Sequence, residues 1–191
     1  MLLRTRTAGF TLIELLIVIT IMAIMAGLVV VNLATSIPDR LQGAAEILAG
    51  EIAYARSLAV TNNDKYLVTI NAALNEIVLT HSGTNAVLDT LPVTAAHSPL
   101  DTASKHVVAL ASLPNLGSTV SVLGAESGAA TPTVISTIEF GPLGETVASE
   151  ASILWLTGGS GDSAAYLSIS VNPVTGLTTI GALQGNRPSG L

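Results

Sequence analysis

The sequence predicts an α+β protein in which a long N-terminal helix, membrane-spanning in its first part, packs on a C-terminal antiparallel β-sheet domain. Three observations predict this fold class. An apolar run covers residues 10–31, an apolar stripe with helical spacing continues to residue 60, and β-rich segments separated by turn residues fill the remainder. The 191 residues suffice for one domain and one additional element.

The composition favours a membrane-associated segment. Hydrophobic residues make up 49% of the chain and charged residues only 10%, which is little charge for a soluble domain. The net charge of −6 argues against a general nucleic-acid binder, since phosphate binding needs clustered lysine and arginine. The chain has no cysteine, which excludes disulfides, thiolate catalysis and zinc–thiolate sites.

Residues 10–31 read FTLIELLIVITIMAIMAGLVVV, with Glu14 as the single charge. About 20 apolar residues in a helix suffice to cross a bilayer core. Arg4 and Arg6 precede the run without any acid, and positive residues stay on the cytoplasmic side. The pattern predicts a basic leader over residues 1–9 and a single-pass transmembrane helix over residues 10–31, with the N-terminus cytoplasmic.

Glu14 needs an explanation, because a carboxylate inside a spanning helix costs roughly 2.5–3.5 kcal/mol. An uncleaved signal anchor leaves the carboxylate unexplained, and a cleaved secretory signal would place small residues after the apolar run, not at Ala8 and Gly9. A cut between Gly9 and Phe10 would create an α-amino group at Phe10. In a bundle of such helices, that amine of one subunit could meet Glu14 of its neighbour.

The stretch GFTLIELL, after a short basic leader, resembles the class III signal of type IV pilins and type II secretion pseudopilins. The resemblance implies that prepilin peptidase cuts after Gly9, that Phe10 becomes the N-methylated terminus, and that Glu14 is the assembly carboxylate. Removing Arg4 and Arg6 leaves a side-chain charge of −6 − 2 = −8. Many major pilins have a proline in the span and a cysteine pair, and the absence of both argues against a principal pilus subunit.

An amphipathic continuation of the N-terminal helix is predicted over residues 32–62. Apolar residues recur at three- and four-residue steps in the helix from Pro38 to Val60, with Glu46 and Arg56 off the centre of the stripe. A bend is expected near residues 36–38. The stripe predicts packing against a sheet; its members are Leu41, Ala45, Leu48, Ile52, Ala55 and Ala59.

A β-rich domain is predicted over residues 63–183, followed by a flexible tail at residues 184–191. Tyr66–Ile70 and Glu76–Thr80 read as a hairpin. Residues 81–105 are ambiguous and include a possible long loop. The further expected strands are 106–113, 118–123, 133–140, 152–157, 166–171 and 177–180.

Three segments of this domain resemble a narrower group, the GspH/FimT minor pseudopilins and minor pilins. They are AYARSLAVTNN at residues 53–63, IEFGPLG at residues 138–144 and ISVNPVTG at residues 169–176. They follow in the order expected for that group, so the resemblance extends over nearly the whole chain. Gly141, Gly144 and Gly176 are also explained as ordinary turn residues of a β domain.

No catalytic, cofactor or metal site is predicted. His81, His97 and His106 lack ligand spacing and are expected in solvated loops or at strand ends. Asp162 lies in the loop TGGSGDSAA, where calcium binding is conceivable, but the loop lacks a series of acids and a flexible hairpin connection is favoured. The chain is expected to be the substrate of an enzyme, not an enzyme.

Three functions compete. The leading one is a minor pseudopilin of a type II secretion system, whose partners are other pseudopilins, prepilin peptidase and the inner-membrane secretion platform. It would lie in the bacterial inner membrane with its C-terminal domain in the periplasm. The second is a FimT-like minor pilin for pilus assembly or DNA uptake. In DNA-binding members of that group, basic residues follow the closing glycine turn. Here Gly176 is followed by Leu177, Thr178 and Thr179, so nucleic-acid binding is not expected. The third is a membrane-anchored binding domain that never polymerises.

Overall fold

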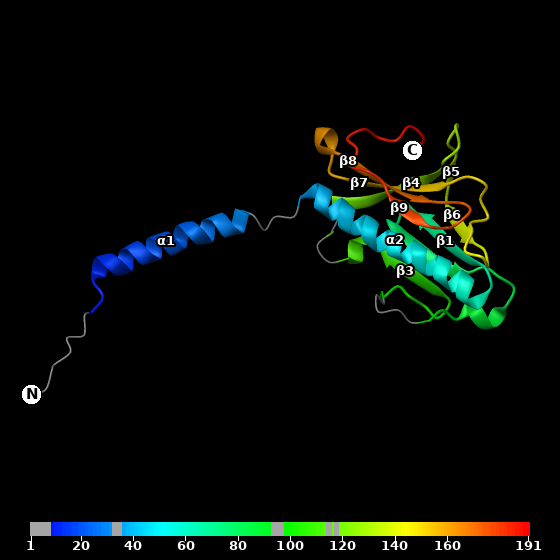
Figure 1. Cartoon of the computed structure of the whole chain (residues 1–191), viewed down its shortest axis with the longest axis horizontal. Coiled ribbons are helices and arrows are strands. Elements are labelled where there is room, and N and C mark those ends of the chain that lie inside the picture. Colours follow the sequence, from blue (N-terminus) through cyan, green and yellow to red (C-terminus); the bar gives the residue numbers. More distant parts are fainter. Residues whose placement is uncertain (1–8, 32–35, 93–97, 114–115, 117–118) are drawn as a thin grey trace, which may run out of the picture. The chain divides into compact units, whose positions relative to one another are not determined.

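The computed structural model describes residues 9–31, 36–92, 98–113, 116 and 119–191, and within these ranges the side chains of residues 27–31 and of Asp162 lie outside the description. The chain divides into two compact units, Met1–Thr35 and Ser36–Leu191. Figure 1 shows the helix Leu12–Val31 (α1) in the first unit, and the helix Ile37–Asn62 (α2) with the sheets in the second.

Helix α1 spans Leu12–Val31 and carries Glu14 in its first turn. Apolar side chains surround this helix on every side, and each described large one is exposed, from Val18 at 48% to Leu12 at 83%. Among the residues that the structure describes, no helix has both the length and the apolar character needed to cross a membrane.

Helix α2 spans Ile37–Asn62 and begins with an N-cap of its own. The Ser36 hydroxyl accepts a hydrogen bond from the Asp39 amide, and the Asp39 carboxylate accepts one from the Ser36 amide. This reciprocal capping box satisfies two amides that the first helical turn leaves free. Residues 32–35, which the sequence prediction placed inside a continuous helix, lie outside the described residues.

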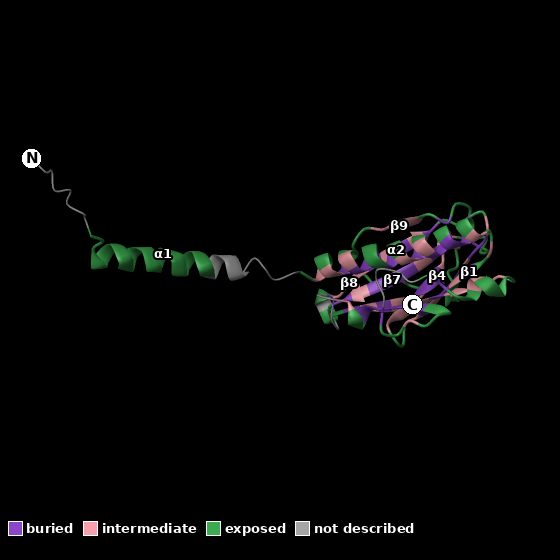
Figure 2. Ribbon diagram, turned by 90° about the horizontal axis from the view of Figure 1, so that it is seen from below, coloured by how far each residue is buried: buried purple, intermediate pink, exposed green. Residues whose placement is uncertain are grey.

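The buried face of α2 is the predicted apolar stripe. All six of its predicted members are buried, and Figure 2 shows the buried side of the helix turned toward the strands. Leu41, Leu48 and Ile52 are fully buried. Burying an aliphatic side chain of this size contributes about 1.5–3 kcal/mol each, so this helix face is a main source of the domain's stability.

Two antiparallel sheets pack against α2, in agreement with the predicted α+β class. The strand orders are β3-β2-β1-β6 and β5-β4-β7-β8-β9. The strands are β1 Tyr66–Asn71, β2 Glu76–His81, β3 Lys105–Ala109, β4 Val120–Ser127, β5 Val134–Ile135, β6 Thr137–Phe140, β7 Ser152–Gly158, β8 Ala165–Val171 and β9 Thr178–Ile180. Short 3-10 turns are η1 Ala86–Asp89, η2 Leu110–Ser112 and η4 Gly161–Ser163.

Strands β1 and β2 form the predicted hairpin, with Tyr66 opposite His81 and Asn71 opposite Glu76. The single strand expected over residues 133–140 is instead two short strands that belong to different sheets. β5 pairs with β4, and β6 pairs with β1. The polypeptide therefore passes from one sheet to the other at Ser136, which lies between them.

The C-terminal residues 184–191 contact the second sheet, although the sequence predicts a flexible tail. Gln184 exchanges two backbone hydrogen bonds with Tyr166. A Cβ added at Gly124 in β4 would lie 2.9 Å from the Leu191 side chain. The outer surface of β4 around Gly124 is thus covered by the end of the chain.

Candidate functional site

The N-terminal site is built around the first turn of α1. Gly9 and Phe10 precede the helix in non-helical backbone and both are exposed. The Glu14 carboxylate accepts hydrogen bonds from the Thr11 amide at 3.2 Å and from the Thr11 hydroxyl at 3.1 Å. The Thr11 hydroxyl in turn accepts from the Glu14 amide at 3.3 Å.

These bonds make Thr11 and Glu14 a capping box, the pattern Ser/Thr-x-x-Glu at a helix start. The signal is visible in the letters TLIE, and the sequence analysis missed it. The carboxylate therefore has a partner in its own chain, and its negative charge also suits the positive end of the helix dipole. Thr11 is neutral, however, so it satisfies the hydrogen bonding of Glu14 without compensating its charge. Among the described residues, no cation pairs with Glu14.

A second constellation centres on Arg56 of α2. Its Nε–H is shared between two backbone carbonyls, that of Gly144 at 3.2 Å and that of Thr175 at 2.7 Å. Gly144 lies in the turn after β6 and has φ +84°, and Gly176 in the turn after β8 has φ +62°. A Cβ at Gly176 would clash with the Gly144 carbonyl oxygen. One arginine thus holds two turns that touch each other.

The Arg56 constellation brings together the three segments that resemble the GspH/FimT group. Arg56 belongs to residues 53–63, Gly144 to residues 138–144, and Thr175 to residues 169–176. The turn roles predicted for Gly144 and Gly176 agree with their positive φ angles. The role of Arg56 was not predicted, because a contact between residues 88 and 119 positions apart leaves no local pattern in the sequence.

His81 is the last residue of β2, so it lies at a strand end, one of the two expected positions, but it is shielded from solvent. Its side chain is 1% exposed and lies between two carboxylates, with Nδ1 2.8 Å from Asp89 and Nε2 3.2 Å from Asp64. The edge of its ring also packs against Tyr66 at a centroid distance of 5.1 Å. The imidazole is buried because residues 64–66 and η1 both contact it at the end of β2.

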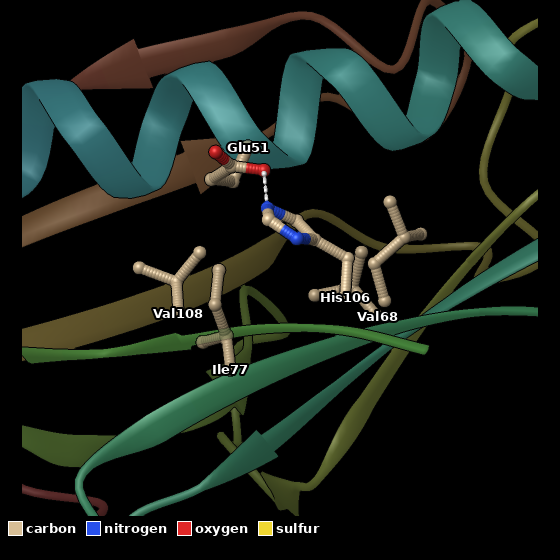
Figure 3. Close-up of a pocket in the computed structure, with 6 residues that line it drawn as sticks. Glu51, Val68, Ile77, His106 and Val108 are labelled. Atoms are coloured by element: carbon tan, nitrogen blue, oxygen red, sulfur yellow. Dashed lines mark ion pairs between the residues drawn. The ribbon is translucent and has the colours of Figure 1, made fainter. Parts of the chain in front are cut away.

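His106 repeats this arrangement one strand away: it is the second residue of β3, close to the strand end, and it is buried. The Nδ1 atom lies 2.9 Å from Asp101 and Nε2 lies 3.3 Å from Glu51 of α2. Figure 3 shows the ring pointing from β3 toward Glu51, beside Val68 and Val108. The small pocket between Glu51, His106 and the neighbouring apolar side chains has no room for a water molecule. A neutral imidazole can donate to one of its two carboxylates, whereas a protonated ring donates to both.

Asp101 connects the His106 cluster to the loop before β3. Its carboxylate accepts hydrogen bonds from the Val107 amide at 2.7 Å and the Ser98 amide at 2.9 Å. Burial acts to raise the pKa of Asp101, but these two amides and the His106 ring outweigh it and hold the pKa below the usual carboxyl value. The cluster therefore favours the ionised form of Asp101.

No group of three or more histidine or acidic side chains within the described part of the chain could hold a metal ion. His97 and the side chain of Asp162, the candidate calcium ligand, lie outside the described residues. Each of the two histidine clusters joins separate segments of the domain by placing an imidazole between two carboxylates. The exposed start of α1 is the candidate functional site.

Comparison with known proteins identifies the N-terminal segment. A family model described as the prokaryotic N-terminal methylation motif matches residues 4–30. This match confirms the predicted prepilin-type signal and covers Gly9, Phe10 and Glu14, whose individual roles stay predictions. No curated protein sequence matches the chain.

Two solved structures are similar to the chain, both of the type IV minor pilin FimU of Pseudomonas aeruginosa strain PAO1. The crystal form in space group P65 is 20% identical, with a TM-score of 0.43, and the alignment covers 74% of this chain and 93% of FimU. The form in P21 is 19% identical, with a TM-score of 0.44, and the alignment covers 80% and 96%. The narrower assignment to the GspH/FimT group stays a prediction.

Proposed function

We propose that this chain is a minor pseudopilin of a type II secretion system. It is a structural subunit that prepilin peptidase processes and that joins other pseudopilins in a helical hetero-polymer. One observation carries the proposal: the methylation motif at residues 4–30 coincides with a helix whose described apolar side chains are all exposed. In water such a surface is unfavourable, so a membrane and then a bundle of like helices are its natural surroundings.

The proposed processing step cuts the peptide bond between Gly9 and Phe10. Both residues lie in exposed, non-helical backbone, which a peptidase can bind in extended form. The cut removes Arg4 and Arg6 with the leader and creates an α-amino group at Phe10, which is then N-methylated. The helix start at Leu12 is left intact.

The proposed assembly step pairs the new amine of Phe10 with Glu14 of a neighbouring subunit. Thr11 already satisfies hydrogen bonds of Glu14 but supplies no positive charge. In an apolar bundle, an uncompensated carboxylate is costly and a partner amine would offset that cost. The small residues Ala23, Ala26 and Gly27 would allow such helices to pack closely.

The proposed location is the bacterial inner membrane, with residues 10–31 spanning it once and the domain from Ser36 to Leu191 in the periplasm. The role is structural and not catalytic. By resemblance, the assembled pseudopilus would help to drive folded exoproteins through an outer-membrane channel, with energy supplied by a cytoplasmic ATPase. The partners would be other pseudopilins and the inner-membrane secretion platform.

The test is a crosslinked pull-down of the full chain from its native membranes, with partners identified by mass spectrometry. Recovery of other pseudopilins and of secretion-platform proteins would support the proposal. Recovery of a major pilin with pilus-assembly proteins would replace it with a type IV pilus role. Recovery of no pilin-like protein, despite efficient crosslinking, would favour the membrane-anchored binding domain.

A further inference from the structure

A groove runs along the polypeptide where it passes from the second sheet to the first. One wall is the segment 131–139, which includes β5 and β6, and the other is residues 146–152. The groove consists of two adjoining cavities of about 260 and 340 Å³ that share Ala148 and Ser152. We call it the crossover groove. None of its residues belongs to the N-terminal site or to the histidine clusters.

The first wall presents alternate residues to the groove, as expected when a strand exposes one face. These residues are Thr131, Thr133, Ile135, Thr137 and Glu139, and Ile138 lines the groove in addition. The groove therefore follows the course of the chain through β5 and β6. Its length and shape suit an extended occupant more than a compact one.

Thr137 also has unpaired backbone groups at the groove. The Ile70 amide donates to the Ser136 carbonyl, and Thr69 lies opposite Thr137. Because antiparallel pairs alternate, the N–H and C=O of Thr137 point away from β1. On that side the Val147 amide reaches the carbonyl of Glu139, while Thr137 has no backbone partner among the described residues. An extended peptide could use these free groups, as in β-strand addition.

The charge of the groove is negative. Glu139 and Glu150 line it, and no lysine, arginine or histidine is among the described residues that do so. The remaining polar lining is mostly hydroxyl groups, which both donate and accept hydrogen bonds. The occupant with complementary charge is therefore basic.

We propose that the crossover groove binds an extended segment of a partner protein that carries lysine or arginine at alternate positions. The backbone of the segment would bond to Thr137, and its basic side chains would meet Glu139 and Glu150. This binding would occur at the domain surface and does not depend on processing at Gly9 or on pairing of Glu14. The proposed peptide binding can therefore be tested independently of the pseudopilin role.

The test measures binding of a fluorescein-labelled peptide, TKTKTKT, to the full chain in detergent by fluorescence anisotropy. The Glu139→Gln/Glu150→Gln double variant removes both charges. Glutamine at residue 139 still has a side-chain oxygen that can accept the hydrogen bond from the Ser82 hydroxyl. We expect its binding to be about fivefold weaker or more, the size typical of two exposed ion pairs. Glu76→Gln, in β2 and outside the groove, is the matched control and should bind like the unaltered chain.

Three results would overturn the proposal. TDTDTDT could bind as tightly as TKTKTKT, the double variant could bind like the unaltered chain, or TKTKTKT could fail to bind at all. A further comparison addresses the extended geometry: the short peptide TKT should bind more weakly than TKTKTKT. Equal binding of the two lengths would show a simple cation site and would reject the extended occupant.

Discussion

The Glu14 carboxylate and Thr11 cap helix α1 together, through hydrogen bonds from the Thr11 amide and hydroxyl and a return bond from the Glu14 amide. Glu14 thus has two separable properties, an acceptor oxygen used within its own chain and a negative charge that this partner does not compensate. The capping function requires only the acceptor. The proposed assembly function requires the charge.

Glu14→Gln separates these two properties, because glutamine also serves in a capping box but carries no charge. We expect Glu14→Gln to be processed normally and to enter the polymer as poorly as Glu14→Ala. The measurement compares the fraction of each variant recovered in the sheared or crosslinked polymer. Normal incorporation of Glu14→Gln beside failed incorporation of Glu14→Ala would assign the residue to capping alone.

Thr11→Val is the complementary control, since it removes the hydroxyl and keeps the charge. The helix start would lose the return bond to the Glu14 amide, at a cost of about 0.5–2 kcal/mol for an N-cap. We expect incorporation close to that of the unaltered chain. A defect as severe as that of Glu14→Ala would contradict the charge-pairing model.

Gly9→Leu tests the processing site. A bulky side chain next to the scissile bond should keep the peptidase from binding the exposed segment at residues 9–10, so the leader should stay attached. Mass spectrometry of the N-terminal peptide then finds the intact leader, whereas the unaltered chain begins with methylated Phe10. Normal cleavage of Gly9→Leu would reject the prepilin-peptidase assignment.

The elements with local patterns could be predicted from the sequence. The apolar stripe of α2 repeats every three to four residues, and turn residues bound the β1–β2 hairpin. A short stretch of sequence is therefore enough to predict each of these elements. The methylation motif is likewise contiguous, at residues 4–30. The capping box at Thr11 was also readable from the letters TLIE, and it was missed because the interpretation of Glu14 centred on its charge.

The features that depend on distant residues could not be predicted. His81 and His106 were expected in solvated loops or at strand ends, and their burial between carboxylates leaves no local pattern in the sequence. Their carboxylate partners are up to 55 positions away, as for Glu51 and His106. The division of residues 133–140 between two sheets has the same origin, because the pairing partners β4 and β1 decide it.

Asp101 should make the stability of the domain depend on acid pH. Its pKa is lowered in the folded state, so its contribution is fully present above the unfolded value of about 4 and is lost as the pH falls through the folded value. We expect Asp101→Asn to be less stable than the unaltered chain at pH 7. The difference should narrow below about pH 4, as measured by urea unfolding of the full chain in detergent. A difference that is constant from pH 7 to pH 3 would contradict this role.

Two glycine substitutions should have opposite effects on stability. Gly176→Ala places a Cβ at φ +62° and against the Gly144 carbonyl, and it should cost at least about 1–2 kcal/mol of unfolding free energy. Gly43→Ala lies inside α2 with nothing within 4 Å of the new Cβ, and it should add about 0.5–1 kcal/mol. Urea unfolding of both variants checks the signs, and a stabilised Gly176→Ala would show that the turn can adopt another conformation.

Arg56→Met tests whether one arginine holds the two turns together. Methionine keeps much of the side-chain packing but removes the Nε–H that the carbonyls of Gly144 and Thr175 share. Because hydrogen bonds from charged donors contribute about 1.5–3 kcal/mol, we expect a loss of that size in urea unfolding. The turns should also loosen, so the amides of Gly144 and Gly176 should exchange hydrogen faster while those at the centre of β7 do not. Unchanged exchange at both turns would show that the direct contact between Gly176 and Gly144 holds them without the arginine.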